Sequence, residues 1–341
     1  MNDFLKDKVS IILPTFNSEK YLNQTLQSII KQNYKNFELI VIDNFSTDKT
    51  LSIINNYLSH NLDIKIFKFR SNNLAKALNF GLNNAVGEFI LRIDSDDLIR
   101  RKRIDKQVKF LKKNKDYHIV GTNALRFEHY KFIIKPFLIN YNDVDLKLSM
   151  LFNSPFIHPT IMFRSSFIKK NKILYDENYN ECEDYNLWYK IMDLTKFKNL
   201  SYFGIFYRVH QNSASFKKKD KLEKFFKIIN NKLINKYGLD FSQNELIYLR
   251  KISLLDINYQ DNFDYCNKIY TNILKKINSK LIKFYPEYEI KNFLKKKYLR
   301  FCLRSTRSKN FKPRKIKNNY FNISYIDYII INLFFFFKII I

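Results

Sequence analysis

Four short apolar runs alternate with amphipathic stretches over the first hundred residues, and this alternation restricts the fold to a few classes. The apolar runs are VSIIL (9–13), FELIVI (37–42), IKIFKF (64–69) and EFILRI (88–93). The stretches between them have helical spacing and read EKYLNQTLQSIIKQ, TDKTLSIINNYL and LAKALNFGLNNA. A strand, helix, strand order is typical of a parallel sheet covered on both faces. We therefore expect an α/β fold, with a Rossmann-like, mostly parallel sheet and helices on both of its faces.

The mixed pattern extends to about residue 215 and then changes. We expect a surface helix over residues 101–114, strands at HIVGT, PTIMF (159–163) and YFGIFYRV, and a helix at CEDYNLWYKIM. Beyond Lys217 the sequence is typical of long amphipathic helices rich in Lys and Asn. These patterns predict one domain over residues 1–215 and a helical C-terminal region over residues 216–341.

Polar residues follow three of the four predicted strands at the point where each ends. They are Pro14-Thr15-Phe16-Asn17, Asp43-Asn44-Phe45-Ser46 and Asp94-Ser95-Asp96-Asp97. Ligands of parallel sheets bind at the carboxyl ends of the strands. We expect the three loops to meet at one rim of the sheet.

Asp94 and Asp96 are one residue apart, so in an extended segment both side chains face the same way. Two such carboxylates repel each other unless a cation lies between them. Carboxylates together with phosphate oxygens suit Mg²⁺ or Mn²⁺, and a diphosphate is then the implied ligand. The alternative is a solvated loop in which Asp97 caps the following helix.

Several ordered motifs extend this pattern over residues 9–215. They are VSIILPTFN, VIDNFSTD, LRIDSDD, KQVKFLKKN, HIVGT, FIHPTIMF, ECEDYNLWYKI and YRVHQNSAS. Together they resemble the family 2 glycosyltransferases, in particular those that build bacterial surface polysaccharide. The resemblance implies the A-type nucleotide-sugar-binding fold, with a C-terminal helical extension here. It also implies an inverting hexosyltransferase that uses a nucleoside diphosphate sugar, with a UDP-sugar favoured, and a glycan or lipid-linked glycan as acceptor.

The resemblance also assigns roles to single residues at the rim. Those it places along or beside the nucleotide are Pro14, Thr15, Asn17, Glu19, Asp43, Lys76, Arg92, Asp94 and Ser95. Within this set, Glu19 would reach the base or ribose and Asp43 the uracil edge. The residues implied at a Mn²⁺ or Mg²⁺ ion are Asp94, Asp96 and His210. Ordinary structural roles remain open: Glu19 as a charge at a helix N-terminus, Lys76 on a solvated face, and Arg92 paired with a neighbouring acid.

The Glu183-Asp184 pair matches the acidic motif that the family places at the start of a helix. An acceptor hydroxyl must lose its proton as it attacks, and a carboxylate opposite the leaving group can take that proton with inversion. The resemblance gives this general-base role to Asp184. His158, which precedes a predicted strand, is either packed or hydrogen-bonded, or in contact with the acceptor or donor. Trp188 either stacks on the acceptor sugar or packs in the core.

The sequence departs from the family pattern at three places. Asn44 and Phe45 replace the usual second acid and glycine of the second loop. Asn73, a residue that tolerates positive φ, stands where a glycine is common. KKNKILYDENYNE lacks the glycine pair often found before the Glu-Asp motif. These changes put the grip on the base and the placement of the acceptor in question.

Charge is unevenly distributed along the chain. There are 60 Lys and Arg against 32 Asp and Glu, a formal net charge of +28 at pH 7. Twelve of the basic residues lie between Lys291 and Lys317 without one acid, followed by the apolar YIDYIIINLFFFFKIII. Residues 328–341 are too few for a comfortable helical crossing. We expect a tail that contacts a membrane surface peripherally; a final core helix is the alternative.

The remaining features bound the location and the competing functions. Cys182, Cys266 and Cys302 lack the spacing of a disulfide framework or a zinc site, and the N-terminus lacks a secretory signal. We expect a cytoplasmic protein on the inner face of the cell membrane. A nucleotidyltransferase would need a glycine- and lysine-rich phosphate loop, which PTFNSEKY does not supply. A basic nucleic-acid-binding protein remains an alternative, although no specific nucleic-acid partner is expected.

Overall fold

The computed structural model describes residues 4–60, 62–70, 73–128, 134–139, 141–179, 181–210, 219–254 and 263–305. The chain forms two compact units. The first comprises Met1–Leu146 and Ser154–Ile229, and the second comprises Lys147–Asn153 and Asn230–Ile341. The second unit therefore includes a short segment from the middle of the chain.

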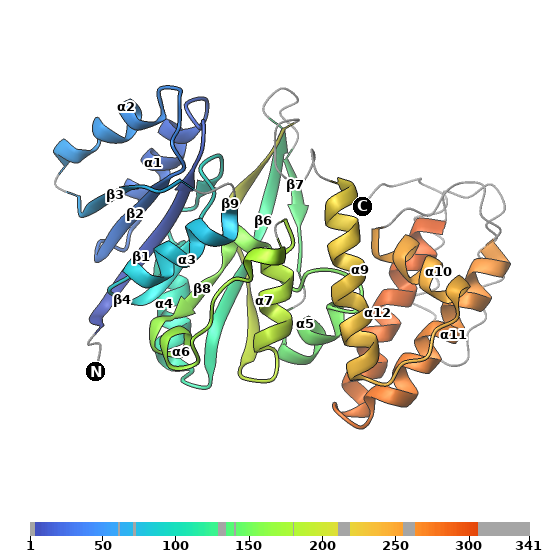
Figure 1. Cartoon of the computed structure of the whole chain (residues 1–341). Helices are drawn as coiled ribbons and strands as arrows, with labels where there is room; N and C mark the ends of the chain where they lie inside the picture. Colours follow the sequence, from blue (N-terminus) through green and yellow to red (C-terminus); the bar gives the residue numbers. More distant parts are fainter. Residues whose placement is uncertain are drawn as a thin grey trace. The chain divides into compact units, whose positions relative to one another are not determined.

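The first unit contains the parallel strands that the apolar runs predict. They are β1 (Leu5–Thr15), β2 (Phe37–Asp43), β3 (Ile64–Lys68) and β4 (Gly87–Arg92), and they lie side by side in the order β3-β2-β1-β4 (Figure 1). Every neighbouring pair in this group is parallel. In the register of β1 and β2, Thr15 stands opposite Asp43, so the two strands end together.

The sheet continues beyond β4 with strands from the later part of this unit. These are β8 (Met162–Arg164), β6 (Tyr117–Glu128), β9 (Lys196–Val209) and β5 (Leu98–Ile99), in that order, with β7 (Ile134–Phe137) on β6. The strand β8 is antiparallel to both of its neighbours, whereas β9 is parallel to β6. The predicted PTIMF strand is correct only in its second half. His158–Thr160 form a 3-10 turn, where Pro159 lacks the N–H that a strand ladder needs.

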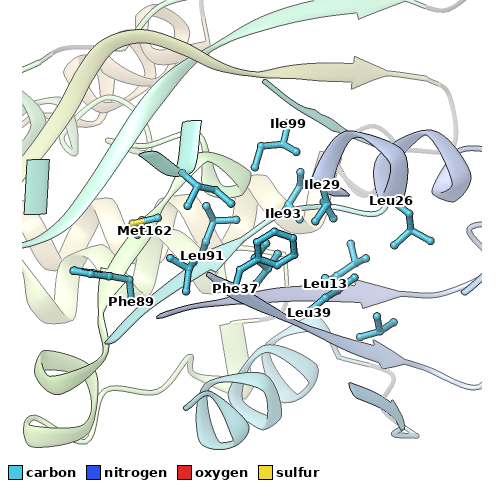
Figure 2. Packing of buried hydrophobic residues seen from close by; sticks show 14 of the residues in the cluster. Leu13, Leu26, Ile29, Phe37, Leu39, Phe89, Leu91, Ile93, Ile99 and Met162 are labelled. Atoms are coloured by element: carbon cyan, nitrogen blue, oxygen red, sulfur yellow. The ribbon is translucent and has the colours of Figure 1, made fainter. Parts of the chain in front are cut away.

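Helices cover both faces of the parallel strands, as predicted. The helices α1 (Leu22–Ile30), α2 (Thr50–Asn55) and α4 (Arg103–Lys113) contribute to one apolar core with Leu13, Leu39 and Leu91 (Figure 2). The helix α3 (Leu74–Asn84) packs on the other face. A Cβ atom on its Gly81 would lie 2.7 Å from Ile12 and 3.1 Å from Ile42, so glycine permits this close approach. Burial on both faces explains the mainly apolar runs of β1, β2 and β4, whereas the edge strand β3 is only partly buried and contains two lysines.

Short elements connect the later strands. They are α5 (Asp143–Ser149), α6 (Ser165–Lys170), α7 (Glu183–Ile191) and the 3-10 turns Leu58–His60 and Glu177–Tyr179. Asn73 precedes α3 with φ −137°, and its side chain accepts a hydrogen bond from the Ala75 N–H. It is therefore an N-cap in extended backbone and does not use the positive φ that asparagine tolerates.

Helices make up the second unit, together with the segment 147–153. They are the C-terminal part of α9 (Lys219–Lys236), α10 (Gln243–Leu254), α11 (Phe263–Leu281) and α12 (Glu287–Ser305). Asn230 Nδ2 donates to the Leu151 carbonyl at 2.8 Å, and the Phe152 and Phe293 rings lie 5.9 Å apart. Among the described helices, none combines the length and apolarity that a membrane crossing requires. The predicted apolar tail lies outside the described residues.

Candidate active site

The first two loops of the rim are tied together by hydrogen bonds. The Asn17 N–H donates to Ser46 Oγ at 3.0 Å, and Asn17 Oδ1 accepts from the Thr47 N–H at 2.9 Å. The Asn44 N–H donates to the Thr15 carbonyl at 2.9 Å. Asn17 has a φ of +45°, a conformation that Asn tolerates better than most residues. Thr15 and Asn17 thus tie the two loops together, with Pro14 just before them opposite Ile42 of β2; their contacts with a nucleotide stay predictions.

Asp43 is the polar centre of these two loops. It is fully buried, and its carboxylate accepts hydrogen bonds from Thr15 Oγ1 at 3.0 Å, from the Ser46 N–H at 3.0 Å and from Ser46 Oγ at 2.6 Å. Both oxygens are therefore used to hold the loops. These loop donors already occupy the carboxylate. The contact of Asp43 with a base edge stays a prediction.

Glu19 and Lys76 lie further out on the surface. Glu19 Oε2 accepts from the Lys49 N–H at 3.0 Å, at the start of α2, so its charge lies at a helix N-terminus. Lys76 Nζ lies 3.6 Å from Glu177 Oε2, and both side chains are about half exposed. Both residues have the ordinary structural roles that the sequence left open; their contacts with a nucleotide stay predictions.

The third loop brings three carboxylates together. Oxygens of Asp94, Asp96 and Asp97 lie within 4.8 Å of one another; we call residues 94–97 the acidic turn. Arg92 is buried and forms a two-pronged ion pair with Asp94, at 2.5 and 3.1 Å. This is the pairing that the sequence left open for Arg92. The position of Arg92 beside the nucleotide stays a prediction.

Asp96 and Asp97 have different partners. His210 Nε2 lies 2.8 Å from Asp96 Oδ2, so these two predicted metal-site residues are neighbours. Asp97 is buried and accepts from the Arg208 N–H at 2.8 Å. The following helix α4 has Lys102 at its N-cap position, so the alternative in which Asp97 caps that helix is wrong.

Ser95 connects the acidic turn to the first loop. Its hydroxyl lies 2.8 Å from Ser18 Oγ, and its carbonyl accepts from Thr25 Oγ1 at 2.9 Å. All three loops are thus joined in a row at the carboxyl ends of β1, β2 and β4.

A second acidic cluster lies at the start of α7. Ser154 Oγ donates to Asp184 Oδ2 at 3.4 Å. Buried Glu183 lies 3.9 Å from His158 Nδ1, and His158 Nε2 is 3.0 Å from the Tyr175 hydroxyl. His158, Glu183 and Asp184 have ligand atoms within 4.8 Å of one another.

Trp188 belongs to the core beneath this cluster. It has no exposed surface, and its ring packs near Phe156 and Phe163. Stacking of Trp188 on an acceptor sugar is therefore wrong, and the core alternative is correct.

Burial and the charge of Arg92 shift the pKa values of the side chains in the two acidic clusters. Burial, together with the charge on Asp184, raises the pKa of Glu183 to about 7. Burial also raises the pKa of Asp184, while the Tyr185 N–H and Arg92 oppose the rise. The pKa of Asp94 is raised to about 6 by burial, against the Arg92 charge. Burial and Arg92 lower the pKa of His158, so this imidazole is neutral.

Comparison with known proteins identifies the family. The model of glycosyl transferase family 2 matches residues 10–171. Glycosyltransferase EpsE of Bacillus subtilis is 35% identical over 215 residues, which are 62% of this chain and 76% of EpsE. The chain belongs to glycosyltransferase family 2. The O-antigen biosynthesis glycosyltransferase WbnJ of Escherichia coli is 33% identical over 216 residues, 61% of this chain and 82% of WbnJ.

The fold of this family 2 glycosyltransferase also matches solved structures. The crystal structure of S. aureus TarS 1–349 in complex with UDP-GlcNAc superposes with a TM-score of 0.56 at 20% identity, over 88% of this chain and 86% of TarS 1–349. The predicted A-type fold with a helical C-terminal part is thereby confirmed.

Arg208 is a site residue of this glycosyltransferase that the sequence analysis missed. Arg208 is buried on β9. Its Nε donates to the Asp96 carbonyl and its Nη2 donates to Gln24 Oε1, both at 2.7 Å. The guanidinium carbon lies 4.2 Å from the Tyr21 ring centroid. Together with its backbone bond to Asp97, it fixes the acidic turn. Its place two residues before His210 was the available signal.

Proposed function

We propose that this glycosyltransferase transfers a sugar from a nucleoside diphosphate sugar, with a UDP-sugar as the favoured donor, to a glycan or lipid-linked glycan acceptor, and that the transfer inverts the anomeric configuration. The observation that carries the proposal is the pair of acidic clusters. Both the acidic turn and the Glu183-Asp184 pair interact electrostatically with Arg92, and the charge on Asp184 contributes to the raised pKa of Asp94. Both clusters thus lie within electrostatic range of Arg92, which supports a common site for them.

The acidic turn has the chemistry of a divalent cation site. Asp94 and Asp96 keep about 30% and 28% of their side chains exposed, and Asp97 Oδ2 is buried without a hydrogen-bond partner among the described residues. Carboxylate oxygens with one imidazole suit Mn²⁺ or Mg²⁺. Asp96 and His210 would hold the ion, and Asp94, already paired with Arg92, would assist. Such an ion, when bound, neutralises the charge that develops on a diphosphate leaving group.

Asp184 would act at the acceptor. Its carboxylate takes the proton of the acceptor hydroxyl while the hydroxyl oxygen bonds to the anomeric carbon. On the opposite side, the bond from that carbon to the diphosphate breaks, and the nucleoside diphosphate leaves with the electron pair. The raised pKa of Asp184 strengthens it as a base. Ser154 orients the carboxylate from one side.

The relatives support a UDP-sugar donor and a polymer acceptor. Poly(ribitol-phosphate) beta-N-acetylglucosaminyltransferase TarS of Staphylococcus aureus is 31% identical over 192 residues, which are 52% of this chain and 31% of TarS. The similarity to WbnJ, an O-antigen biosynthesis enzyme, supports an acceptor in surface polysaccharide synthesis.

A binding and transfer assay tests the proposal. Wild-type protein with Mn²⁺ is expected to bind UDP, and a saturating donor at about 100 times its dissociation constant adds roughly 2.7 kcal/mol to the free energy of unfolding. Asp96→Ala should lose this stabilisation, whereas Asp184→Asn should keep it and lose sugar transfer. Retention on nucleic acid without any nucleotide binding by the wild type would contradict the proposal.

The basic, apolar tail supports peripheral attachment to an anionic membrane, at the inner face of the cell membrane. Each Lys or Arg near such a surface contributes about 1 kcal/mol. Deleting residues 318–341 should move the protein from the membrane fraction to the soluble fraction at moderate salt, measured by sedimentation. An unchanged distribution would refute attachment through the tail.

A further inference from the structure

Phe45 adopts a backbone conformation that a phenylalanine normally avoids. Its φ is +54°, in the left-handed region, and its side chain is 44% exposed. A non-glycine residue in this region costs of the order of 1 kcal/mol, and the cost persists at sites where the side chain has a use. An exposed ring recovers little of this cost through core packing. The stability of the fold therefore does not explain the conformation of Phe45, and a role in binding does.

Arg70 lies against the Phe45 ring. The guanidinium carbon is 4.8 Å from the ring centroid, within the range of a cation–π contact. The two residues meet because the Phe69 N–H donates to the Asp43 carbonyl at 2.9 Å, which ties the chain just before Arg70 to the end of β2. Both side chains are exposed, so the pair faces solvent.

A second exposed ring, that of Phe16, belongs to the adjoining loop. Hydrogen bonds from Asn44 to Thr15 and from Asn17 to Ser46 flank residues 16 and 45 on both sides. Phe16 is 59% exposed. Two aromatic side chains are thus presented by two loops that are held in a fixed register.

Phe45 lies at one end of the row of joined loops, and the acidic turn lies at the other. Ser46 contacts Asn17, and the next residue, Ser18, contacts Ser95 of the acidic turn. A nucleoside diphosphate has its groups in the same order, with a planar base at one end and a charged diphosphate at the other. Asp43 is fully buried and its carboxylate accepts hydrogen bonds from the loops, so stacking on the face of a base at this end needs exposed groups.

We propose that Phe45, backed by Arg70, is the stacking surface for the base of the donor nucleotide in this chain. The inference rests on the proposed function, because it needs a nucleoside diphosphate at the rim. Aromatic stacking uses the π-face that every base has, and it contributes about 1–3 kcal/mol per base. Loss of the ring should weaken binding of the nucleoside part and leave binding of the diphosphate part unchanged.

The test compares Phe45→Gly with wild type in two measurements. Glycine relieves the left-handed backbone, so the thermal midpoint is expected to rise. The dissociation constant for UDP with Mn²⁺ is expected to increase by about 5- to 150-fold, and that for inorganic pyrophosphate with Mn²⁺ to stay within twofold. Phe45→Trp should retain most of the UDP affinity.

Lys172 offers a matched control for the backbone effect. It is also exposed and has a φ of +49°, so Lys172→Gly relieves the same kind of strain away from the rim. It should leave UDP affinity unchanged. Equal UDP affinity in Phe45→Gly and wild type would overturn the stacking role, and so would an equal loss of UDP and pyrophosphate binding. The proposed function fails instead if wild type binds UDP and pyrophosphate without any divalent ion. It also fails if wild type binds no nucleotide at all.

Discussion

Glu183 illustrates, at the scale of a single residue, how the fold sets the properties of an acidic group. The side chain is buried, and its Oε2 has no hydrogen-bond partner within the described part of the chain. Burial therefore disfavours its charged form. Beside it, Asp184 keeps hydrogen bonds from Ser154 and from backbone. The two adjacent carboxyls thus have different hydrogen-bond partners, although burial raises the pKa of both.

Glu183 should make stability depend on pH. Its folded pKa of about 7 is above the ordinary value of 4.5, so between these values the folded protein binds more protons than the unfolded chain. The free energy of unfolding should fall as pH rises through this window, by about 2–3 kcal/mol. Urea denaturation at pH 5 and pH 8 measures it.

The matched variant for this prediction is Glu183→Gln, which keeps the shape and removes the titration. Its free energy of unfolding should change less between pH 5 and pH 8 than that of wild type. Glu177→Gln, at a half-exposed position, should behave like wild type. The same pH dependence in Glu183→Gln and wild type would show that another group is responsible.

The sequence singled out individual residues only where a local pattern marked them. Asp94, Asp96 and Asp184 stand in acidic motifs at element ends, and these patterns were visible. The importance of Arg208 and Tyr175 comes from contacts with residues far away in the chain, such as Gln24 and His158. Apart from the place of Arg208 two residues before His210, a single sequence holds no signal for such pairs.

At the scale of elements, β9 is the strand that supports the acidic turn. It pairs with β6 along most of its length and with β5, the short strand directly after the turn. Its Arg208 bonds to the Asp96 carbonyl and to Asp97, and its neighbour His210 reaches Asp96. The geometry of the turn therefore depends on a strand more than 100 residues later.

Arg208→Lys should loosen the turn without removing the positive charge. Lysine cannot replace both guanidinium hydrogen bonds, so the free energy of unfolding should fall by about 1–3 kcal/mol. Affinity for Mn²⁺, measured by calorimetric titration, should fall as well. Arg164→Lys is the control, because Arg164 is also buried but donates to the Leu111 carbonyl. It should lose stability and keep Mn²⁺ affinity; equal Mn²⁺ affinity in both variants would contradict the role of Arg208.

The elements themselves were predictable to different degrees. The strands β1, β2 and β4 were found because strands buried on both faces are mainly apolar runs, and β3 was found from its alternation of apolar residues with Lys. The prediction for the PTIMF segment was less accurate. The residue pattern favours a strand because Ile161 and Phe163 are good strand formers, and it does not account for the N–H that Pro159 lacks. The capping role of Asn73 was missed for a similar reason, because positive φ and N-capping both favour asparagine.

At the scale of the whole molecule, the second unit takes a segment from within the sequence of the first. Residues 147–153 include Leu151 and Phe152, both buried, and their partners Asn230 and Phe293 belong to the same unit. The sequence predicted a simple division near residue 215, since composition changes there. A segment of seven residues is too short to leave a compositional signal.

A fragment that ends at residue 229 should therefore expose apolar surface and aggregate. It keeps residues 147–153 but lacks Asn230 and Phe293, so apolar side chains become exposed. We expect aggregation on size-exclusion chromatography and increased binding of a hydrophobic dye. In the same fragment, Phe152→Ser should reduce dye binding, whereas Leu58→Ser, at a position already 49% exposed, should not. A monomeric fragment with no dye binding would show that the segment finds other cover.

The borrowed segment also affects the order in which this enzyme can mature on the ribosome. Asn230 follows Leu151 by 79 residues. At about 5–20 residues per second, the nascent chain waits roughly 4–16 s between translation of these two residues, and longer before Phe293 is made. During that interval the apolar stretch has no native cover, which makes it a natural binding site for chaperones that act during translation.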